Sequence, residues 1–209
     1  MSDAATLPAR SARKPKGEGH SRRAEILAAA ERIFVDHGYE GATIRKIADE
    51  VGLSSTALYM HFADKGAILH EICRNAFQTL LNAHQGIQDD DQPAERRLRR
   101  MIETYVEFGF ENPNAYRLIY LTRPVEAQEA QSAAREVGAT LFRSFEAAVE
   151  AVAAEGRLAV DPRTAAQAIW AGGHGVVSLM ITKPYFDWVD RRELTRTLLD
   201  ALFKGLLRP

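Results

Sequence analysis

Apolar residues recur at the spacing of an α-helix along almost the whole chain, and this periodicity constrains the fold most strongly. From Ser21 onwards they return every third or fourth residue, and no segment alternates apolar and polar residues as a half-buried strand does. Helix-stop and helix-capping residues interrupt the pattern at intervals. The sequence therefore predicts an all-α fold of about nine helices.

The interruptions divide the periodic pattern into helical segments. We expect them at about residues 21–37, 44–51, 55–61, 65–86, 94–111, 113–121, 126–155, 162–182 and 190–207. Gly38, Gly52 and Gly156 end three of the segments, because glycine is a common helix stop. Thr43 and Ser54 stand where a helix N-cap is needed, since their hydroxyl groups accept hydrogen bonds from free backbone amides.

Composition narrows the class of protein. The chain has 209 residues, of which 46% are apolar and 26% charged, so we expect a globular protein with one mid-sized domain or two small ones. The longest apolar run is too short to cross a bilayer. Cys73 is the only cysteine, which excludes an intrachain disulfide and a cysteine-based zinc site. The N-terminus lacks the apolar stretch of a secretory signal, so we expect a cytoplasmic protein without a membrane partner.

Charge is unevenly distributed although the net charge is only −1. Residues 1–23 hold six Lys or Arg against two acidic residues, whereas residues 24–66 hold four basic and seven acidic residues. We expect residues 1–20 to be a disordered basic tail. Such a tail either increases solubility, or is a cloning remnant, or is an arm that touches DNA phosphates or a minor groove.

The segment from Ile44 to Phe62 has the pattern of a helix–turn–helix. Ala48 is small where two helices would cross closely, and Gly52 stands at the turn, where a positive φ is needed. The second helix starts at Ser54 and exposes small polar residues, which lets a recognition helix reach the floor of the major groove. A plain corner of two packed helices would show the same spacing, so this motif alone leaves both interpretations open.

Four stretches of residues 22–70 together carry a more specific resemblance. They are Phe34–Tyr39, Thr43–Ile44, Ile47–Ser54, and Leu58–Phe62 followed by Asp64, Lys65 and Leu69. This combination resembles the N-terminal DNA-binding domain of the TetR/AcrR family of one-component regulators. Val51 and Met60 depart from the residues common in that family. The resemblance implies a DNA-binding domain over residues 21–66 and a ligand-binding and dimerisation domain over residues 67–209.

The resemblance also implies roles for individual residues. Those at phosphate-contacting positions are Thr43, Tyr59, His61 and Lys65. Those at positions that reach base edges are Arg45, Ser55 and Thr56. Backbone amides at the helix start near Ser54 would also favour phosphate. Each role has an alternative: Tyr59 as a packed core aromatic, Lys65 as a solvated surface lysine, and His61 as a residue that only fills the turn.

Residues 168–179 resemble the Trp-His-Gly signature of one C-terminal ligand-binding subfamily. Trp170 and His174 are four residues apart and share one helix face. The segment also contains Gly172, Gly173 and Gly175, and a glycine inside a helix costs about 1 kcal/mol relative to alanine. Close helix contact or pocket volume is expected to offset this cost.

A helical bundle of this size with many aromatic residues can hold an apolar pocket. The candidate lining residues are Phe77, Leu81, Met101, Tyr105, Phe108, Tyr116, Ile119, Tyr120, Phe142, Phe145, Trp170, His174 and Val177. Any one of them is alternatively an ordinary core residue. Their sparse polar groups in an apolar wall suit a lipophilic or aromatic ligand.

We expect no catalytic site, metal or other cofactor. His174 invites a catalytic interpretation, but a histidine in an apolar helix is more commonly a hydrogen-bonded core residue. Local spacing yields neither a Ser–His–Asp arrangement nor a carboxylate pair, and the other histidines do not have the spacing of metal ligands.

The last two predicted helices, over 162–182 and 190–207, are expected to form a homodimer interface, although their leucines alternatively only close the core of one subunit. With the resemblance, this implies a dimeric repressor that binds a near-palindromic operator in double-stranded DNA and is released by a small-molecule effector. Its expected targets are efflux or catabolic genes. The alternatives are an activator, a ligand-independent regulator and, from another class, a helical-bundle enzyme or ligand carrier.

Overall fold

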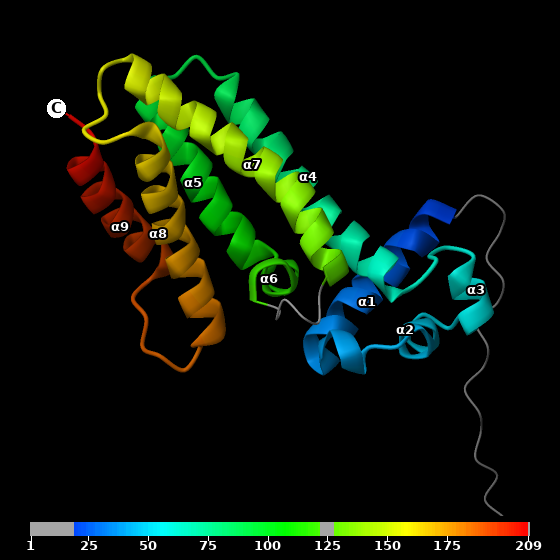
Figure 1. The fold of residues 1–209 in the computed structure, drawn as a ribbon. Coiled ribbons are helices and arrows are strands. Elements are labelled where there is room, and N and C mark those ends of the chain that lie inside the picture. The colour runs from blue at the N-terminus through cyan, green and yellow to red at the C-terminus, as the bar shows by residue number, and fades with distance from the viewer. Residues whose placement is uncertain (1–18, 122–127, 209) are drawn as a thin grey trace, which may run out of the picture. The chain divides into compact units, whose positions relative to one another are not determined.

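The structure is a computed structural model that describes residues 19–121 and 128–208 (Figure 1). Nine α-helices and one π-helical segment occupy these ranges. They are α1 (Gly19–Gly41), α2 (Ile44–Glu50), α3 (Ser55–Tyr59), α4 (Lys65–Gln88), α5 (Ala94–Glu111), α6 (Pro113–Tyr116), η1 (Arg117–Leu121), α7 (Gln128–Ala154), α8 (Pro162–Thr182) and α9 (Arg191–Leu206). The β-structure within the described ranges is a single bridge between Leu158 and Leu207. The predicted all-α class is confirmed.

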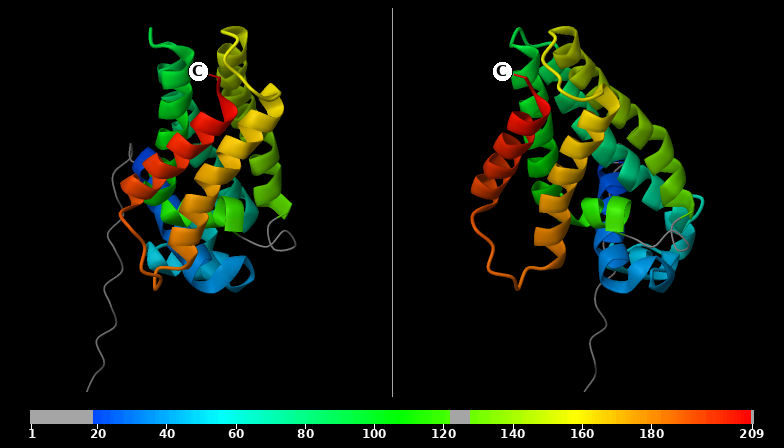
Figure 2. Two further views of the ribbon diagram at one scale, coloured as in Figure 1. Left: turned by 90° about the vertical axis from the view of Figure 1, so that its left-hand side faces the viewer. Right: turned by 60° about the vertical axis from the view of Figure 1, so that its left-hand side comes forward.

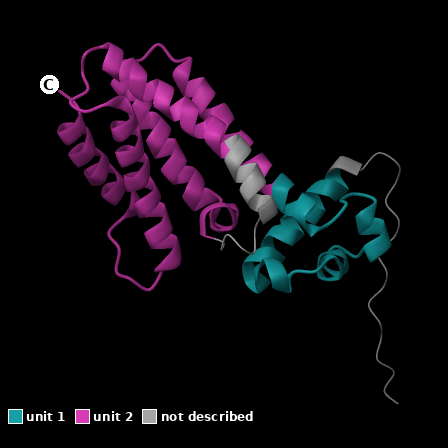
Figure 3. Cartoon of the chain, in the orientation of Figure 1, with its two compact units in different colours: residues 1–71 teal, residues 72–209 magenta. Residues whose placement is uncertain are grey.

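The chain divides into two compact units, residues 1–71 and residues 72–209 (Figure 3). Helices α1 to α3 and the first residues of α4 belong to the first unit. The remainder of α4 and all later helices belong to the second. The domain boundary expected from the sequence, between residues 66 and 67, falls inside α4.

Side-chain caps fix where the short helices of the first unit begin. The hydroxyl group of Thr43 accepts a hydrogen bond from the Lys46 amide at the start of α2. The hydroxyl group of Ser54 accepts one from the Ala57 amide at the start of α3. Both bonds satisfy amides that have no partner within their helix, as the sequence predicts.

Two glycines of the first unit adopt the left-handed conformation. Gly52 has φ 66° in the turn between α2 and α3, as expected for a helix–turn–helix. Gly38 has φ 69° and interrupts the helical geometry of α1 where the sequence predicts its end. The chain then forms one further turn before α2 begins. These turns let α2 pack against both α1 and α3.

The core of the first unit draws on all four of its helices. Its buried residues include Ile26, Ala30, Phe34, Ile47, Ala48, Leu58, Phe62, Ile68 and Leu69. Ala48 is fully buried, in agreement with its expected place at a close helix crossing.

Two arginines that the sequence groups with the basic N-terminus hold this unit together instead. Arg23 donates to the Glu71 carboxylate and to the His61 carbonyl oxygen, the latter at 2.6 Å. Arg22 pairs with Glu25 and donates to the Val51 carbonyl oxygen at 3.3 Å. Residues 1–18 of the expected tail lie outside the described residues, and α1 begins at Gly19 rather than at Ser21.

In the second unit α5 packs against α7 and α8, and α9 packs against α8 (Figures 1 and 2). Glycines allow close approach at these contacts. A Cβ atom on Gly109 would lie 2.5 Å from Val177, and one on Gly173 would lie 2.7 Å from Ile102. A Cβ atom on Gly172 would lie 2.9 Å from Leu202 on α9. Close helix contact therefore explains two of the three glycines of the 168–179 segment.

The third of these glycines, Gly175, faces open space, and nothing in the structure explains it. A second departure from expectation concerns residues 113–121, for which one short helix is predicted. The structure has α6 followed by the π-helical segment η1. A π turn is wider than an α turn and is common near functional sites.

Candidate functional site

All eight residues predicted to contact DNA lie in the first unit and are accessible to solvent. The exposed ones are Thr43, Arg45, Ser54, Thr56 and Tyr59. The partly exposed ones are Ser55, His61 and Lys65. They come from the start of α2, from α3 with its cap, and from the segment that leads into α4.

Tyr59 ends α3 with 54% of its surface exposed. The alternative of a packed core aromatic is therefore wrong. Its neighbour Leu58 is fully buried and anchors the helix, while Met60 on the other side is 84% exposed. An exposed phenol on a well-anchored short helix is available to donate a hydrogen bond to a phosphate.

Lys65 is held in place rather than freely solvated. Its Nζ donates to the Tyr39 carbonyl oxygen at 2.9 Å and lies 4.1 Å from the centroid of the Tyr39 ring. The Glu40 carboxylate lies 3.6 Å from the same nitrogen. An ammonium group has three donors, so these contacts fix its position and leave one donor for a phosphate oxygen.

Arg45 and Lys46 form a basic start to α2. The Arg45 guanidinium lies 3.8 Å from Asp49 in an ion pair whose two members are 86% and 70% exposed, so the pair is weak. Lys46 is exposed and its Nζ donates to the Gly41 carbonyl oxygen at 2.8 Å. Lys46 is absent from the sequence-based candidates, although its adjacency to Arg45 was a signal for it.

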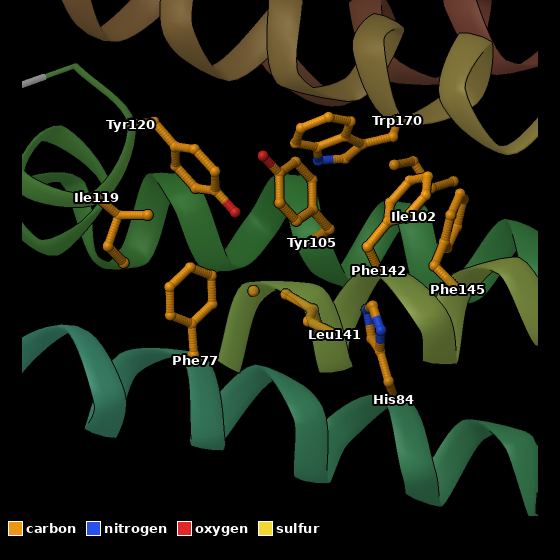
Figure 4. A pocket seen from close by; sticks show the side chains of 11 residues that line it. Phe77, His84, Ile102, Tyr105, Ile119, Tyr120, Leu141, Phe142, Phe145 and Trp170 are labelled. Atoms are coloured by element: carbon orange, nitrogen blue, oxygen red, sulfur yellow. The ribbon is translucent and has the colours of Figure 1, made fainter. Parts of the chain in front are cut away.

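The second unit contains an apolar cavity of about 190 Å³ (Figure 4). Helices α4, α5, α7 and α8 and the segment η1 contribute to its wall. The lining residues are Phe77, His84, Ile102, Tyr105, Ile119, Tyr120, Gly138, Leu141, Phe142, Phe145 and Trp170. Both η1 residues of this set, Ile119 and Tyr120, are placed by the π turn. Such a wall favours a largely apolar ligand.

Seven of the thirteen pocket candidates from the sequence line this cavity, and six do not. The seven are Phe77, Tyr105, Ile119, Tyr120, Phe142, Phe145 and Trp170. The six are Leu81, Met101, Phe108, Tyr116, His174 and Val177. Tyr116 and Val177 pack against Gly109 instead, and Met101 lies within the core of the unit. A ligand-binding role for the seven stays a prediction.

His174 belongs to a cluster with two tyrosines. Its Nδ1 lies 2.5 Å from the Tyr116 hydroxyl and 3.2 Å from the Tyr105 hydroxyl, and the two hydroxyls are 3.1 Å apart. Burial lowers the pKa of His174 and raises the pKa of both tyrosines, so all three are neutral near pH 7. This arrangement supports the interpretation of His174 as a hydrogen-bonded core histidine. Trp170 lies on the same helix face, with ring centroids 6.0 Å apart.

Four lining residues have no counterpart among the sequence-based candidates: His84, Ile102, Gly138 and Leu141. His84 is the most informative, since only 2% of its surface is exposed. Its Nε2 lies 3.1 Å from the Met101 carbonyl oxygen, and burial lowers the pKa of His84 to about 4. Its position seven residues after Phe77 places both on one face of α4, a signal that the sequence contained.

Two further properties of the described ranges, 19–121 and 128–208, bear on the site. No helix there has the length and apolar character needed to cross a membrane. Nor do three His, Cys, Asp or Glu side chains gather there in an arrangement that would hold a metal ion.

Family models match both units of the chain. The model described as "Bacterial regulatory proteins, tetR family" matches residues 26–72, which include α2 and α3. The model described as "Tetracyclin repressor-like, C-terminal domain" matches residues 98–202, which include five of the cavity-lining aromatic residues. The assignment to the Trp-His-Gly subfamily stays a prediction.

Individual relatives agree with these models. The transcriptional activator FasR of Mycolicibacterium smegmatis is 31% identical over 125 residues, which are 58% of this chain and 56% of that protein. The transcriptional repressor AcnR of Corynebacterium diphtheriae is 47% identical over 53 residues, 25% of this chain and 28% of that protein. The chain thus matches little more than half the length of FasR and a smaller part of AcnR.

A solved structure extends the likeness to nearly the whole chain. The TetR family regulator PfmR of Thermus thermophilus superposes with a TM-score of 0.66 at 26% identity and covers 88% of this chain and 99% of its own. These relatives are transcription regulators and not enzymes. The chain belongs to the TetR family of bacterial transcription regulators.

Proposed function

We propose that the chain is a homodimeric repressor that binds a near-palindromic operator and releases it when a small, largely apolar effector enters the cavity of the second unit. The observation that carries this proposal is the coexistence of an exposed helix–turn–helix surface in one unit and an apolar cavity in the other. The protein would act in the cytoplasm, where the operator DNA lies.

The DNA-binding part of the proposal rests on α2 and α3. The exposed polar residues Ser55 and Thr56 stand at the N-terminal end of α3, where a recognition helix contacts base edges. Arg45 stands at the start of α2 and would add a base contact, since arginine reads guanine in the major groove. Tyr59 and Lys65 would fix the register through phosphates.

Salt dependence would show whether the basic tail is an arm that contacts DNA. Lys46 and Lys65 would give two phosphate contacts per subunit, which predicts a slope of about −4 for log K against log salt in a dimer. Engagement of the four basic residues at positions 10–16 in each subunit would steepen the slope to about −11. Removing residues 1–18 changes the measured slope only if the tail is an arm.

Dimerisation is proposed through α8 and α9. The two helices pack closely at Gly172, and α9 presents Leu194, Leu198, Leu202 and Leu206, which are only partly buried in one subunit. A second copy would cover these leucines across a two-fold axis. The two helix–turn–helix motifs of such a dimer match the two halves of a palindromic operator.

Helix α4 is the proposed route between the two sites. It carries Lys65 at its first residue and the cavity-lining Phe77 and His84 further along. An effector that binds one conformer of this helix better than the other shifts the population of the DNA-binding form. A nearly complete switch requires a roughly 10⁴-fold preference for the released form.

Footprinting of the purified protein on the DNA that flanks its own gene tests the proposal. Protection of a near-palindromic site by the wild-type protein, and its loss in Tyr59→Ala with Lys65→Ala, is the expected result. Salt-sensitive protection without sequence preference would argue against a local operator.

An activator is the second candidate, because the relative FasR is one. A reporter gene placed behind the protected site distinguishes the two: deletion of the regulator raises expression for a repressor and lowers it for an activator. Efflux or catabolic genes beside the regulator's own gene are the proposed targets.

A further inference from the structure

The cavity of the second unit has an apolar wall with few polar atoms. Among the residues that the structure describes, eleven line this cavity, and none of them is Asp, Glu, Lys or Arg. The side chains with polar atoms are His84, Tyr105, Tyr120 and Trp170. An ionised ligand would therefore lose its hydration without gaining an opposite charge from this wall, which is strongly unfavourable.

The proton of His84 can be assigned from its contacts. Nε2 lies 3.1 Å from the Met101 carbonyl oxygen, and a carbonyl oxygen can only accept. Nε2 therefore carries a hydrogen and donates it. Burial keeps the ring neutral near pH 7, because the pKa of His84 is lowered to about 4. A neutral imidazole has one N–H, so Nδ1 carries a lone pair and accepts.

Nδ1 of His84 is buried and has no hydrogen-bond partner among the residues that the structure describes. Figure 4 shows the His84 ring extending from α4 into the cavity toward Phe142. The Tyr105 hydroxyl on the same wall is already bonded to Tyr116 and His174. Buried polar atoms in folded proteins are nearly always paired, so an unpaired acceptor on a cavity-lining side chain points to a ligand that supplies the donor.

We propose that the cavity takes an uncharged one- or two-ring hydrophobic molecule that bears one hydroxyl group, and that this hydroxyl donates to Nδ1 of His84. The cavity volume of about 190 Å³ is somewhat larger than the roughly 150 Å³ of an engineered apolar cavity that binds benzene. The inference rests on the proposed function for the role of the cavity as the effector site.

The same geometry predicts what the cavity rejects. A methyl group or an ether in place of the hydroxyl leaves Nδ1 unpaired, and an ether oxygen also faces the lone pair of another acceptor. A carboxylate adds an uncompensated negative charge next to that lone pair. Among ligands of equal size, the hydroxyl compound therefore binds most tightly.

Calorimetric titration of the full-length protein with naphthalen-2-ol and 2-methylnaphthalene tests the proposal. The two probes have nearly the same shape, and only the first has a donor. We expect the wild-type protein to bind naphthalen-2-ol about tenfold more tightly, the effect of one net hydrogen bond to a buried acceptor.

Two variants of His84 assign that difference to the proposed atom. His84→Leu removes the acceptor, and the ratio of the two affinities should fall to about 1. His84→Gln keeps one donor for the Met101 carbonyl and one acceptor, and it should retain a preference for the naphthol. Phe145 lies on the same wall but has no polar side-chain atom. Phe145→Leu should therefore weaken the binding of both probes and leave the ratio of their affinities unchanged.

Equal binding of the two probes by the wild-type protein would overturn the proposal. So would the same preference in His84→Leu, or no binding of either probe up to its solubility. The wild-type comparison stands even if His84→Leu fails to fold. A naphthol that binds through His84 but leaves operator binding unchanged would instead count against the proposed ligand response, while the ligand assignment would stand.

Discussion

The two units place their polar side chains in opposite ways. In the first unit Thr56 and Tyr59 stand exposed on a short helix that is anchored by one fully buried leucine. In the second unit Tyr105, Tyr116 and His84 are buried, and the first two are bonded within a closed cluster. Exposed polar groups are suited to a large charged partner that arrives from solvent. Buried ones select a small partner by its few polar atoms.

Long-range contacts of charged residues stabilise both units: Arg23 joins α1 to Glu71 in the first, and Arg191 of α9 pairs with Glu107 of α5 in the second. The second unit adds close helix packing at glycines, where Gly109 and Gly173 admit neighbouring side chains. Substitutions should therefore act on DNA affinity in one unit and on packing or ligand affinity in the other.

The largest effect is expected from Tyr59→Ala combined with Lys65→Ala. Each substitution would remove a charge-assisted hydrogen bond to phosphate. The two losses together should weaken specific operator binding at least about 100-fold. Fluorescence anisotropy with a labelled operator at fixed salt measures this loss. The matched control is Lys183→Ala with Tyr185→Ala, which removes the same residue types from an exposed segment of the second unit. Equal losses in both double variants would contradict the assignment.

A smaller effect is expected when the pH changes, because the buried His84 makes the stability of the folded protein depend on pH. Its pKa is about 4 in the folded protein and near the usual value of 6.5 in the unfolded chain. Between these values the unfolded chain binds a proton that the folded chain does not, so stability falls as pH falls. The free energy of unfolding should drop by about 2 kcal/mol from pH 7 to pH 5. His174, whose pKa is also lowered, acts in the same direction.

Urea unfolding of the wild-type protein and of His84→Gln at the two pH values checks this prediction. The variant should lose most of the pH-dependent drop, because glutamine does not titrate. A drop of the same size in both proteins would place the responsible group elsewhere.

Some features of the first unit could be predicted from the sequence alone, and others could not. The caps at Thr43 and Ser54 and the turn at Gly52 depend on neighbouring residues, so local pattern was enough to predict them. The contacts of Lys65 with Tyr39 span 26 residues and became visible only in the structure. The helix–turn–helix was thus predictable as a motif, whereas the way its cations are held was not.

The cavity shows the same limit more strongly. Its wall is assembled from α4, α5, η1, α7 and α8, and the sequence does not say which core residues border empty space. Val177 and Tyr116 satisfied the expected pattern but pack against Gly109. Gly138 lines the cavity because it lacks a side chain, which a search for aromatic residues overlooks.

A pair of glycine substitutions tests the packing of the second unit. Gly109→Ala places a Cβ atom 2.5 Å from Val177, and the overpacking should outweigh the gain in helix propensity by about 1 kcal/mol. Gly175→Ala faces open space and should instead stabilise the protein by up to about 1 kcal/mol. Thermal unfolding measures both. Changes of the same sign in the two variants would contradict the close contact between Gly109 and Val177.

The smallest change in stability is expected from Arg45→Ala. Its ion pair with Asp49 is highly exposed, so the free energy of unfolding should stay within about 0.5 kcal/mol of the wild-type value. The preference of the variant protein for particular operator bases should nevertheless change if Arg45 contacts a base edge. Selection of bound sequences from a randomised operator pool would reveal this change, and an unaltered preference would assign Arg45 to phosphate contact or to solvent.

We propose that occupation of the cavity in the second unit controls operator binding by the first unit. The most direct test is an anisotropy titration of the operator with and without saturating naphthalen-2-ol, at fixed salt, for the wild-type protein and His84→Leu. We expect the naphthol to weaken operator binding by the wild-type protein tenfold or more, and we expect a much smaller response from His84→Leu. An operator affinity that is unchanged in the naphthol-saturated wild-type protein would contradict it.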